Sequence, residues 1–291
     1  MSGFRQARRR GLLFVVPYGA SFTAFIVLPI VVALVLAFMQ FDLTSRESIK
    51  FIGWRNFQEA LADKYFWMAM KATVSYVVLM VPSLIVSSLA VALGMNAMSH
   101  GRSSVRALLF LPGMLNVAVS AILWRWFYEG EFGLLNYYLK HLGFQPLPWL
   151  SDVHYAMPSI VLMSLWWVMG GTSVILLTAL QQIPKQIVEA AVLDGAVNGR
   201  LFFRVLLPQL RPVLLFVVIT NTIAGFQVFG QPLLLTNGGP ELATRGVVQY
   251  IYEQAFSTYR LGYGAAMSWL LFAVIAVLAI GQYQLFRRAV S

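Results

Sequence analysis

The most distinctive pattern of charged and small side chains lies in the segment 181–212, which reads QQIPKQIVEAAVLDGAVNGRLFFRVLLPQLRP. Gly195 offers a turn between two short amphipathic segments, which would meet there as an elbow. The small Ala190 and Ala191 would let another surface approach closely, and Glu189 could pair with an arginine of a partner protein. The pattern is typical of a protein-docking elbow, and the alternative is an amphipathic hairpin that lies on the lipid headgroups.

A second group of side chains could bind a solute within the apolar parts of the chain. Its members are uncharged and polar or aromatic, and they are Asn116, Trp166, Trp167, Asn221, Thr222 and Gln227. Such groups suit a neutral solute rich in hydroxyls, because sugars bind through hydrogen bonds and ring stacking. The alternative is that they hydrogen-bond helices to one another. Spacings of four and three predict that Asn221, Gly225 and Val228 share one helical face.

Residues for catalysis or metal binding are not grouped in the sequence. The three histidines (His100, His141 and His154) have no metal-ligand spacing, and the chain has no cysteine. No glycine-rich phosphate loop ends in Lys-Ser or Lys-Thr. The pair Gly170-Gly171 lies in an apolar stretch, where it predicts close helix packing or a cavity wall. We therefore expect no ATP hydrolysis, no metal and no cofactor in this chain, and a membrane enzyme would lack clustered acids, bases or nucleophiles.

The elements that position these groups must be membrane-spanning helices. Apolar residues make up 59% and charged residues only 11% of the 291 positions, which is too apolar for a soluble fold. A spanning helix needs about 20 mostly apolar residues, and lipid offers backbone groups no partner outside the helix. The predicted fold class is an all-α polytopic membrane protein with six spans, at 12–38, 72–95, 105–127, 157–180, 212–235 and 265–286.

The placement of basic residues predicts the orientation of these spans. If the N-terminus lies inside, the inner segments carry 12 of the 21 basic residues but only 2 of the 11 acidic ones. Lysine and arginine favour the cytoplasmic side, so both termini are predicted to be cytoplasmic. The net charge of +10 then reflects topology and not a nucleic-acid surface. The uncharged run at 11–41 exceeds the apolar core of a signal peptide, about 7–15 residues, which predicts an uncleaved first helix.

The elbow segment resembles the signature of bacterial ABC-importer permeases. That signature is Glu-Ala-Ala, three residues, Gly, nine residues and Ile-x-Leu-Pro, and it is matched here by Glu189-Ala190-Ala191, Gly195 and Val205-Leu206-Leu207-Pro208. Only valine for isoleucine departs from it. Further segments resemble the sugar-permease branch, which includes the larger maltose and glycerol-3-phosphate permease subunits, and these are LFLP at 109–112, TNGGP at 236–240, YIYEQAF at 250–256 and GYGAA at 262–266.

This resemblance implies one of two permease subunits of a type I importer in the bacterial inner membrane. The implied partners are a second homologous permease, two ABC ATPases that bind ATP and Mg, an extracytoplasmic solute-binding protein and membrane lipid, with no nucleic acid. The implied parts are a cytoplasmic N-terminus with the first helix at 1–38 and a five-helix core at 72–286, which includes the coupling loop 181–211. Coupling to the ATPases is expected at Glu189, Ala190, Ala191, Asp194, Gly195, Leu207 and Pro208.

The resemblance also implies which positions line half of the solute pathway. They are Gly113, Asn116, Val117, Trp167, Gly171, Asn221, Gly225 and Val228. The side chains differ from those of the maltose permease, which leaves a sugar, a polyol or a glycerol phosphate derivative as candidate solutes. The competing class is a stand-alone secondary carrier or channel for a small polar solute. It would need coupling groups or a homo-oligomeric pore, and it would leave the elbow unexplained.

Single cysteines test the predicted orientation on a background that has none. We expect Ser103→Cys and Asn198→Cys to be labelled only from the cytoplasm, and Ser151→Cys and Thr244→Cys only from outside, because the basic segments lie inside. The measurement is labelling by an impermeant maleimide in sealed cells and in opened membranes. Labelling of Asn198→Cys in sealed cells would contradict the orientation.

Overall fold

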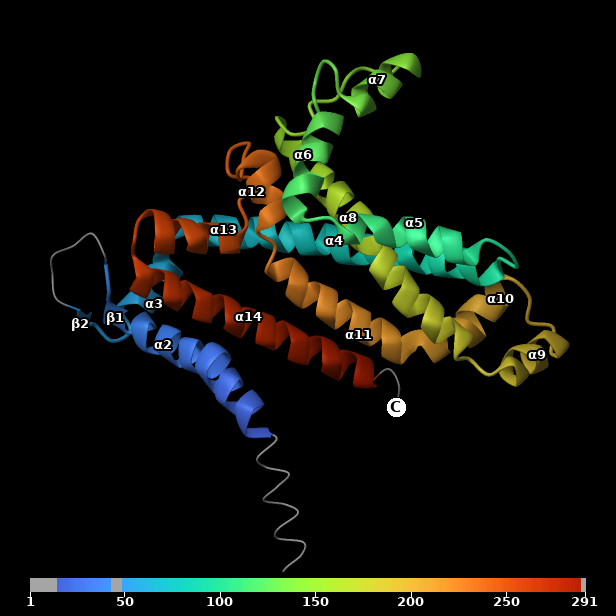
Figure 1. Ribbon diagram of the computed structural model, residues 1–291, viewed down its shortest axis with the longest axis horizontal. Helices are drawn as coiled ribbons and strands as arrows, with labels where there is room; N and C mark the ends of the chain where they lie inside the picture. The colour runs from blue at the N-terminus through green and yellow to red at the C-terminus, as the bar shows by residue number, and fades with distance from the viewer. Residues whose placement is uncertain (1–14, 43–48, 289–291) are drawn as a thin grey trace, which may run out of the picture. The chain divides into compact units, whose positions relative to one another are not determined.

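The computed structural model describes residues 15–42 and 49–288, and helices make up most of this part of the chain (Figure 1). Contacts divide the chain into two compact units, which are Met1–Asp63 with Ile251–Ala273, and Lys64–Tyr250 with Val274–Ser291. Each unit has its own packed apolar residues.

The long apolar helices overlap the spans that the sequence predicts, with different bounds. Five helical segments are long and apolar enough to cross a membrane, and they are Val15–Ala37, Lys64–Ala97, Val153–Gln181, Gly199–Phe226 and Leu261–Arg287. Two further helices, α5 (Arg102–Met114) and α6 (Val117–Phe127), together could make a sixth span, with a bend of 100° between them. The all-α membrane fold is confirmed, with five spans, or six if α5 and α6 together form one. Residues 12–14 of the first predicted span lie outside the described residues.

The first unit begins with a helix whose side chains are nearly all exposed, as suits a surface in contact with lipid. This helix contains a π-helical turn (Thr23–Val27) and α2 (Leu28–Ala37). The predicted outer loop that follows holds an antiparallel pair of short strands, β1 (Met39–Gln40) and β2 (Lys50–Phe51), and then α3 (Arg55–Ala62).

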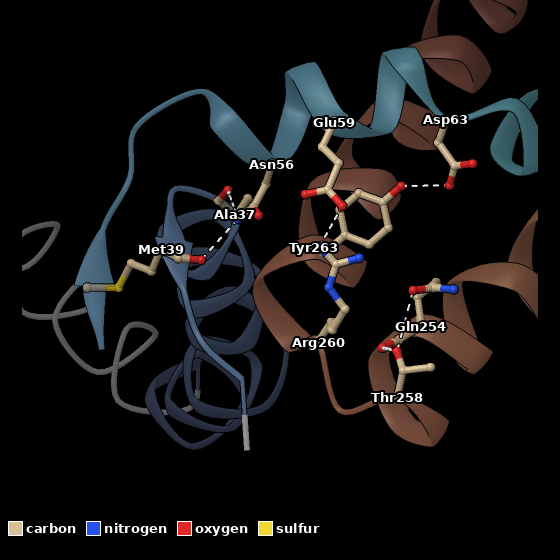
Figure 2. Close-up of polar contacts among 9 residues, drawn as sticks. All are labelled: Ala37, Met39, Asn56, Glu59, Asp63, Gln254, Thr258, Arg260 and Tyr263. Atoms are coloured by element: carbon tan, nitrogen blue, oxygen red, sulfur yellow. Dashed lines mark hydrogen bonds and ion pairs between the residues drawn. The ribbon is translucent and has the colours of Figure 1, made fainter. Parts of the chain in front are cut away.

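The end of the first span is fixed by contacts with α3 and with the start of α14 (Leu261–Arg288). Ala37, Phe57 and Ala266 pack together in a small buried cluster. The amide of Asn56 donates to the carbonyl oxygens of Ala37 and Met39, at 2.9 Å each (Figure 2). The carbonyl of Ala37, at the end of α2, lacks an intrahelical partner, so the buried Asn56 amide supplies the donor that it needs and also binds the Met39 carbonyl of β1.

The second unit is built around α4 (Lys64–Ala97), which packs along α8 (Val153–Gln181). The third partner is α11 (Leu207–Phe226). Their contact buries an apolar cluster composed of Ala92, Met95, Leu176, Leu177, Leu180, Leu210, Leu214 and Val217. Small and branched side chains at this crossing let the three helices pack closely.

The third predicted span, 105–127, is wrong as a continuous helix. Leu115 and Asn116 adopt extended backbone conformations between α5 and α6. The Asn116 side chain accepts a hydrogen bond from the N–H of Ala118 at 2.9 Å and so caps α6. Asparagine is a strong N-cap residue, so a second helix begins here, whereas apolar composition alone predicts a single continuous helix.

The fifth predicted span, 212–235, is wrong at both ends. The helix runs without interruption over Gly199–Phe226, so the second amphipathic segment of the elbow is its first part. Pro208 cannot donate to the carbonyl four residues earlier, and a π-helical turn at Phe202–Leu206 precedes it. The helix ends at Phe226, and after a short non-helical segment the chain continues as α12 (Gly230–Thr236).

The shorter helices of the second unit are α7 (Leu134–His141), α9 (Lys185–Leu193) and, at its boundary, α13 (Val247–Tyr252), while α10 (Gly199–Leu201) is the first turn of the helix Gly199–Phe226. The predicted outer loop around α7 is held by carboxylates that accept backbone hydrogen bonds. The N–H of Phe132 lowers the pKa of Glu129, and the N–H of His154 lowers the pKa of Asp152, which caps α8. Both carboxylates therefore stay charged at neutral pH.

Thr244 is a poor labelling site, contrary to its choice from the sequence. It is only 1% exposed, and its hydroxyl lies 2.7 Å from the Thr236 hydroxyl and donates to the Gly239 carbonyl. Ser151 is exposed and remains the probe for the predicted outer side. Ser103 and Asn198 are also exposed.

Gly170 lies at the crossing of α8 and α5. A Cβ atom at this position would overlap the carbonyl oxygen of Leu109 on α5, whereas a Cβ atom at Gly171 would meet nothing within 4 Å. The predicted close packing of this glycine pair is confirmed for Gly170 only. The two helices can approach this closely because Gly170 has no side chain.

This difference gives a matched pair of substitutions. We expect Gly170→Ala to destabilise the protein by about 1–3 kcal/mol, because the backbone of α5 must move to relieve the overlap. Gly171→Ala should be close to neutral, since it adds the same methyl group to open space. The measurement is the thermal unfolding midpoint in detergent, and equal midpoints for the two variants would contradict the proposed crossing.

Candidate functional site

A cavity of about 280 Å³ lies in the second unit, where several helices meet the non-helical segment between α11 and α12. Its walls come from α4, α6, α8 and α11, from the residues between α11 and α12, and from the start of α12. Among its lining residues none carries a charge, and the polar groups are amides, a phenol, an indole and backbone. The cavity can therefore offer hydrogen bonds and aromatic contacts without an ionic interaction.

Five of the residues predicted for the solute pathway line this cavity, namely Val117, Trp167, Asn221, Gly225 and Val228. Val228 reaches it by a different route from the predicted one. The helix ends at Phe226, so the spacing from Gly225 is not helical, and the turn beyond the helix carries Val228 to the cavity. Asn221 and Gly225 remain on one helical face, as predicted.

The other three predicted pathway residues do not line the cavity. The exposed Asn116 caps α6, as described above. A Cβ atom on Gly113 would lie 3.2 Å from the carbonyl oxygen of Trp167, so Gly113 packs against α8. Gly171 faces open space elsewhere on α8. Asn116 therefore helps to form the interruption of the third span, and Gly113 helps to pack that span against α8.

Trp167 connects the cavity to that break. Its indole Nε1 donates a hydrogen bond to the carbonyl oxygen of Leu115, at 3.0 Å. Leu115 precedes the N-cap of α6, so its carbonyl lies outside the regular hydrogen bonding of a helix. One side chain thus forms part of the cavity wall and stabilises the interrupted span beside it.

Sequence reasoning missed several lining residues, namely Tyr76, Met80, Val168, Ala224, Phe229, Gly230 and Gln231. Tyr76 and Met80 lie four residues apart on α4, which is the spacing of one helical face. That spacing also fits burial in a helix bundle, so it did not single them out. The residues after Phe226 were hidden because the sequence predicts an unbroken helix there.

The Asn221 side chain has one group committed and one available. Its amide nitrogen donates to the carbonyl oxygen of Val217, at 2.8 Å, one turn earlier on α11. This bond fixes the side chain against its own helix. The amide oxygen can accept a hydrogen bond from a hydroxyl in the cavity.

The elbow has a well-defined turn at the end of α9. Gly195 takes a φ of +82°, and its N–H donates to the carbonyl of Val192 at 3.0 Å. The N–H of Ala196 donates to the carbonyl of Ala191 at 2.9 Å. This pair of bonds is the Schellman motif, in which glycine favours the left-handed conformation. No described atom lies within 4 Å of a Cβ atom built on Gly195, so conformation and not crowding requires glycine.

The helix before this turn presents its side chains outward. None of the described residues of α9 is buried, and Leu193 at its end is 88% exposed. Glu189, Ala190 and Asp194 are exposed as well, while Ala191 is half-buried. An exposed apolar surface with adjacent carboxylates is typical of a protein-docking site.

Leu207 and Pro208 lie apart from this exposed surface. They are the first residues of α11, and Leu207 packs against the apolar cluster of α4, α8 and α11. The predicted coupling residues therefore fall into two groups. One group, at 189–195, lies on the exposed surface of the elbow, and the other joins the elbow to the packed helices.

Comparison with known proteins gives a consistent result across most of the chain. Residues 60–291 match the protein family described as binding-protein-dependent transport system inner membrane component. The chain is 31% identical to the sulfoquinovosyl glycerol transport system permease protein of Agrobacterium fabrum, over 92% of this chain and 87% of the relative. It is 32% identical to the trehalose/maltose transport system permease protein of Thermococcus litoralis, over 94% and 91% of the two chains.

A solved structure has the same fold. A chain of the bacterial alginate ABC transporter, crystallised in complex with an alginate pentasaccharide-bound periplasmic protein, aligns with a TM-score of 0.86. The alignment covers 99% of this chain and 98% of that chain. The sequences are 20% identical, so this likeness concerns the fold.

Proposed function

Since the chain belongs to the family of binding-protein-dependent transport system inner membrane components, we propose that it forms half of the pathway for a neutral sugar or polyol. It is a multi-pass permease subunit of an ABC importer in the bacterial inner membrane. The uncharged lining of the cavity among α4, α6, α8 and α11 carries the proposal for the solute. An anionic solute such as a glycerol phosphate would lack a cationic partner from this chain there.

The relatives support a solute rich in hydroxyls. Two of them are permease proteins of transport systems for sulfoquinovosyl glycerol and for trehalose or maltose. In this chain, Asn221 and Gln227 offer amides and Trp167 offers an aromatic surface to the same cavity. A second homologous permease subunit would supply the other half of the pathway.

The elbow is the proposed contact with two cytoplasmic ATPases, which would bind ATP and Mg. Its exposed carboxylate Glu189 and exposed Leu193 suit a partner groove with a basic rim. Closure of the ATPases would move the elbow, and the movement would open the cavity toward an extracytoplasmic solute-binding protein. This assignment places the elbow and both termini in the cytoplasm, in line with the distribution of basic residues.

Asn221 tests the solute pathway. We expect Asn221→Leu to lower uptake about tenfold, because the substitution removes a hydrogen-bond acceptor from the cavity and adds apolar bulk. The matched control is Thr220→Val on the same helix, since Thr220 is exposed and does not line the cavity. The measurement is solute uptake by proteoliposomes that contain the assembled importer and its binding protein.

Three results would separate the roles that Asn221 could have. The proposal expects normal assembly and retained stimulation of ATP hydrolysis in Asn221→Leu, with reduced uptake. Loss of the complex from the membrane would instead assign Asn221 to helix packing. Unchanged uptake would remove Asn221 from the pathway.

Gly195 and Glu189 test the coupling. We expect Gly195→Val and Glu189→Lys to abolish transport while the helices still insert and pair with the other permease. The left-handed conformation costs an ordinary residue roughly 1–2 kcal/mol, and more for a β-branched one, so valine should open the turn. The measurement is paired: uptake by proteoliposomes, and retention of the ATPase subunits on the purified complex.

The matched control for the turn is Gly199→Val. Gly199 lies in the same segment, and a Cβ atom built on it would also meet nothing within 4 Å, but its φ is not positive. This variant should transport normally. Wild-type transport by both Gly195→Val and Glu189→Lys would refute the elbow as the coupling element, and uptake by this chain without ATPases would favour a secondary carrier.

A further inference from the structure

One side chain of the solute cavity combines burial with an unused hydrogen-bonding group. Gln231 lies in the first turn of α12 and lines the cavity. It is 9% exposed, and its amide has no hydrogen-bond partner among residues 15–42 and 49–288. The Ser120 hydroxyl and the Trp124 indole N–H also lack a partner among these residues, but protein atoms enclose them, whereas neither amide atom of Gln231 is enclosed. A molecule in the cavity can therefore reach the Gln231 amide.

The other side chains of the cavity that carry N–H groups are bonded already or open to water. The amide nitrogen of Asn221 and the indole nitrogen of Trp167 donate to backbone carbonyls, at 2.8 and 3.0 Å. Gln227 is exposed, so water competes with a solute for its amide. Gln231 differs from all three, because its amide is largely removed from water and still unpaired. A buried polar group without a partner is unfavourable, so a solute that pairs with it gains affinity.

The position of Gln231 is fixed at both ends of α12. Gly230 packs against α6, and a Cβ atom on it would lie 3.1 Å from a methyl group of Val117. At the other end of α12, the hydroxyls of Thr236 and Thr244 lie 2.7 Å apart. The TNGGP segment, which begins at Thr236, thus helps to keep the short helix in place. A side chain on a fixed helix loses less freedom when it binds a solute.

The chemistry of an amide indicates which solute groups suit this position. A glutamine side chain carries an acceptor oxygen and a donor nitrogen next to each other in one plane. A hydroxyl can donate and accept, so two hydroxyls on adjacent carbons can pair with both amide atoms at once. An ether oxygen or a lone hydroxyl pairs with one amide atom and leaves the other unpaired. The amide therefore favours solutes with adjacent hydroxyls, as in ring sugars and sugar alcohols.

We propose that Gln231 is a specificity-determining residue that binds two adjacent hydroxyl groups of the solute. Its amide oxygen accepts a hydrogen bond from one hydroxyl, and its amide nitrogen donates to the other. The Asn221 oxygen is available to a further hydroxyl from the side of α11. This inference rests on the proposed function, because it names the residue that recognises the proposed sugar or polyol.

The test begins with the solute that the importer accepts. Proteoliposomes with the assembled importer and its binding protein are offered a mixture of isotope-labelled glucose, xylose, sorbitol, trehalose and maltose, and uptake is measured by mass spectrometry. The compound with the highest uptake is then compared with its monodeoxy analogues, each of which lacks one hydroxyl. Uptake is measured with saturating loaded binding protein, so that the rate depends on the permease and not on the affinity of the binding protein.

We expect Gln231→Leu to lower uptake of that compound about tenfold, because leucine cannot form the hydrogen bonds. Analogues that lack either of the two bound hydroxyls should enter the wild type more slowly. They should enter Gln231→Leu as fast as the complete compound, because the contact is already lost and the two effects do not add. Gln58→Leu is the matched control, because Gln58 is exposed on α3 and does not line the cavity.

The remaining results would overturn the assignment, each in its own way. Unchanged uptake in Gln231→Leu would remove Gln231 from recognition and leave the proposed function intact. A lower thermal unfolding midpoint, or equal sensitivity of wild type and variant to every missing hydroxyl, would assign Gln231 to helix packing. Uptake of none of the offered compounds by the wild type would contradict the proposed solute class, and this inference with it.

Discussion

A bilayer leaves no water for backbone N–H and C=O groups, so every interruption of a spanning helix must be repaired by the protein itself. The second unit contains two such interruptions, and both adjoin the solute cavity. Between α5 and α6, the Trp167 indole binds the Leu115 carbonyl and Asn116 caps the second helix. After α11, the N–H groups of Gln227 and Val228 return to carbonyls of the helix end. The cavity therefore lies where the helices are broken and where polar backbone is surrounded by protein.

The same geometry connects the cavity to the elbow. The helix Gly199–Phe226 begins in the elbow and carries Asn221 and Gly225 to the cavity wall. A displacement at the elbow can thus travel along this helix, whose middle part, from Leu207 to Val217, is packed against α4 and α8. Two hydrogen bonds close the Schellman turn at Gly195, and they fix the direction in which the chain leaves α9.

In the first unit, the backbone groups that need partners lie at the end of a helix whose side chains are nearly all exposed. Asn56 satisfies the last carbonyl of that helix and the Met39 carbonyl beyond it, and the ion pair of Arg260 with Glu59 joins the residue before α14 to α3. These polar contacts leave Arg55 uncommitted at the point where the apolar surface stops.

The sequence by itself determined the membrane class, the six apolar segments and the elbow, because these depend on composition and on short-range spacing. Gly195 is an example, since its role follows from residues within one turn of it. Only the tertiary structure decided where the spans break and which residues share the cavity. Asn116 looks like a pathway residue in an unbroken helix, yet it caps α6, and Val228 reaches the cavity only because α11 ends at Phe226. Gly170 and Gly171 are equivalent in the sequence, and only the position of Leu109 on α5 distinguishes them. Apolar composition is the same on both sides of a break, so the contacts that stabilise the break cannot be read from the chain alone.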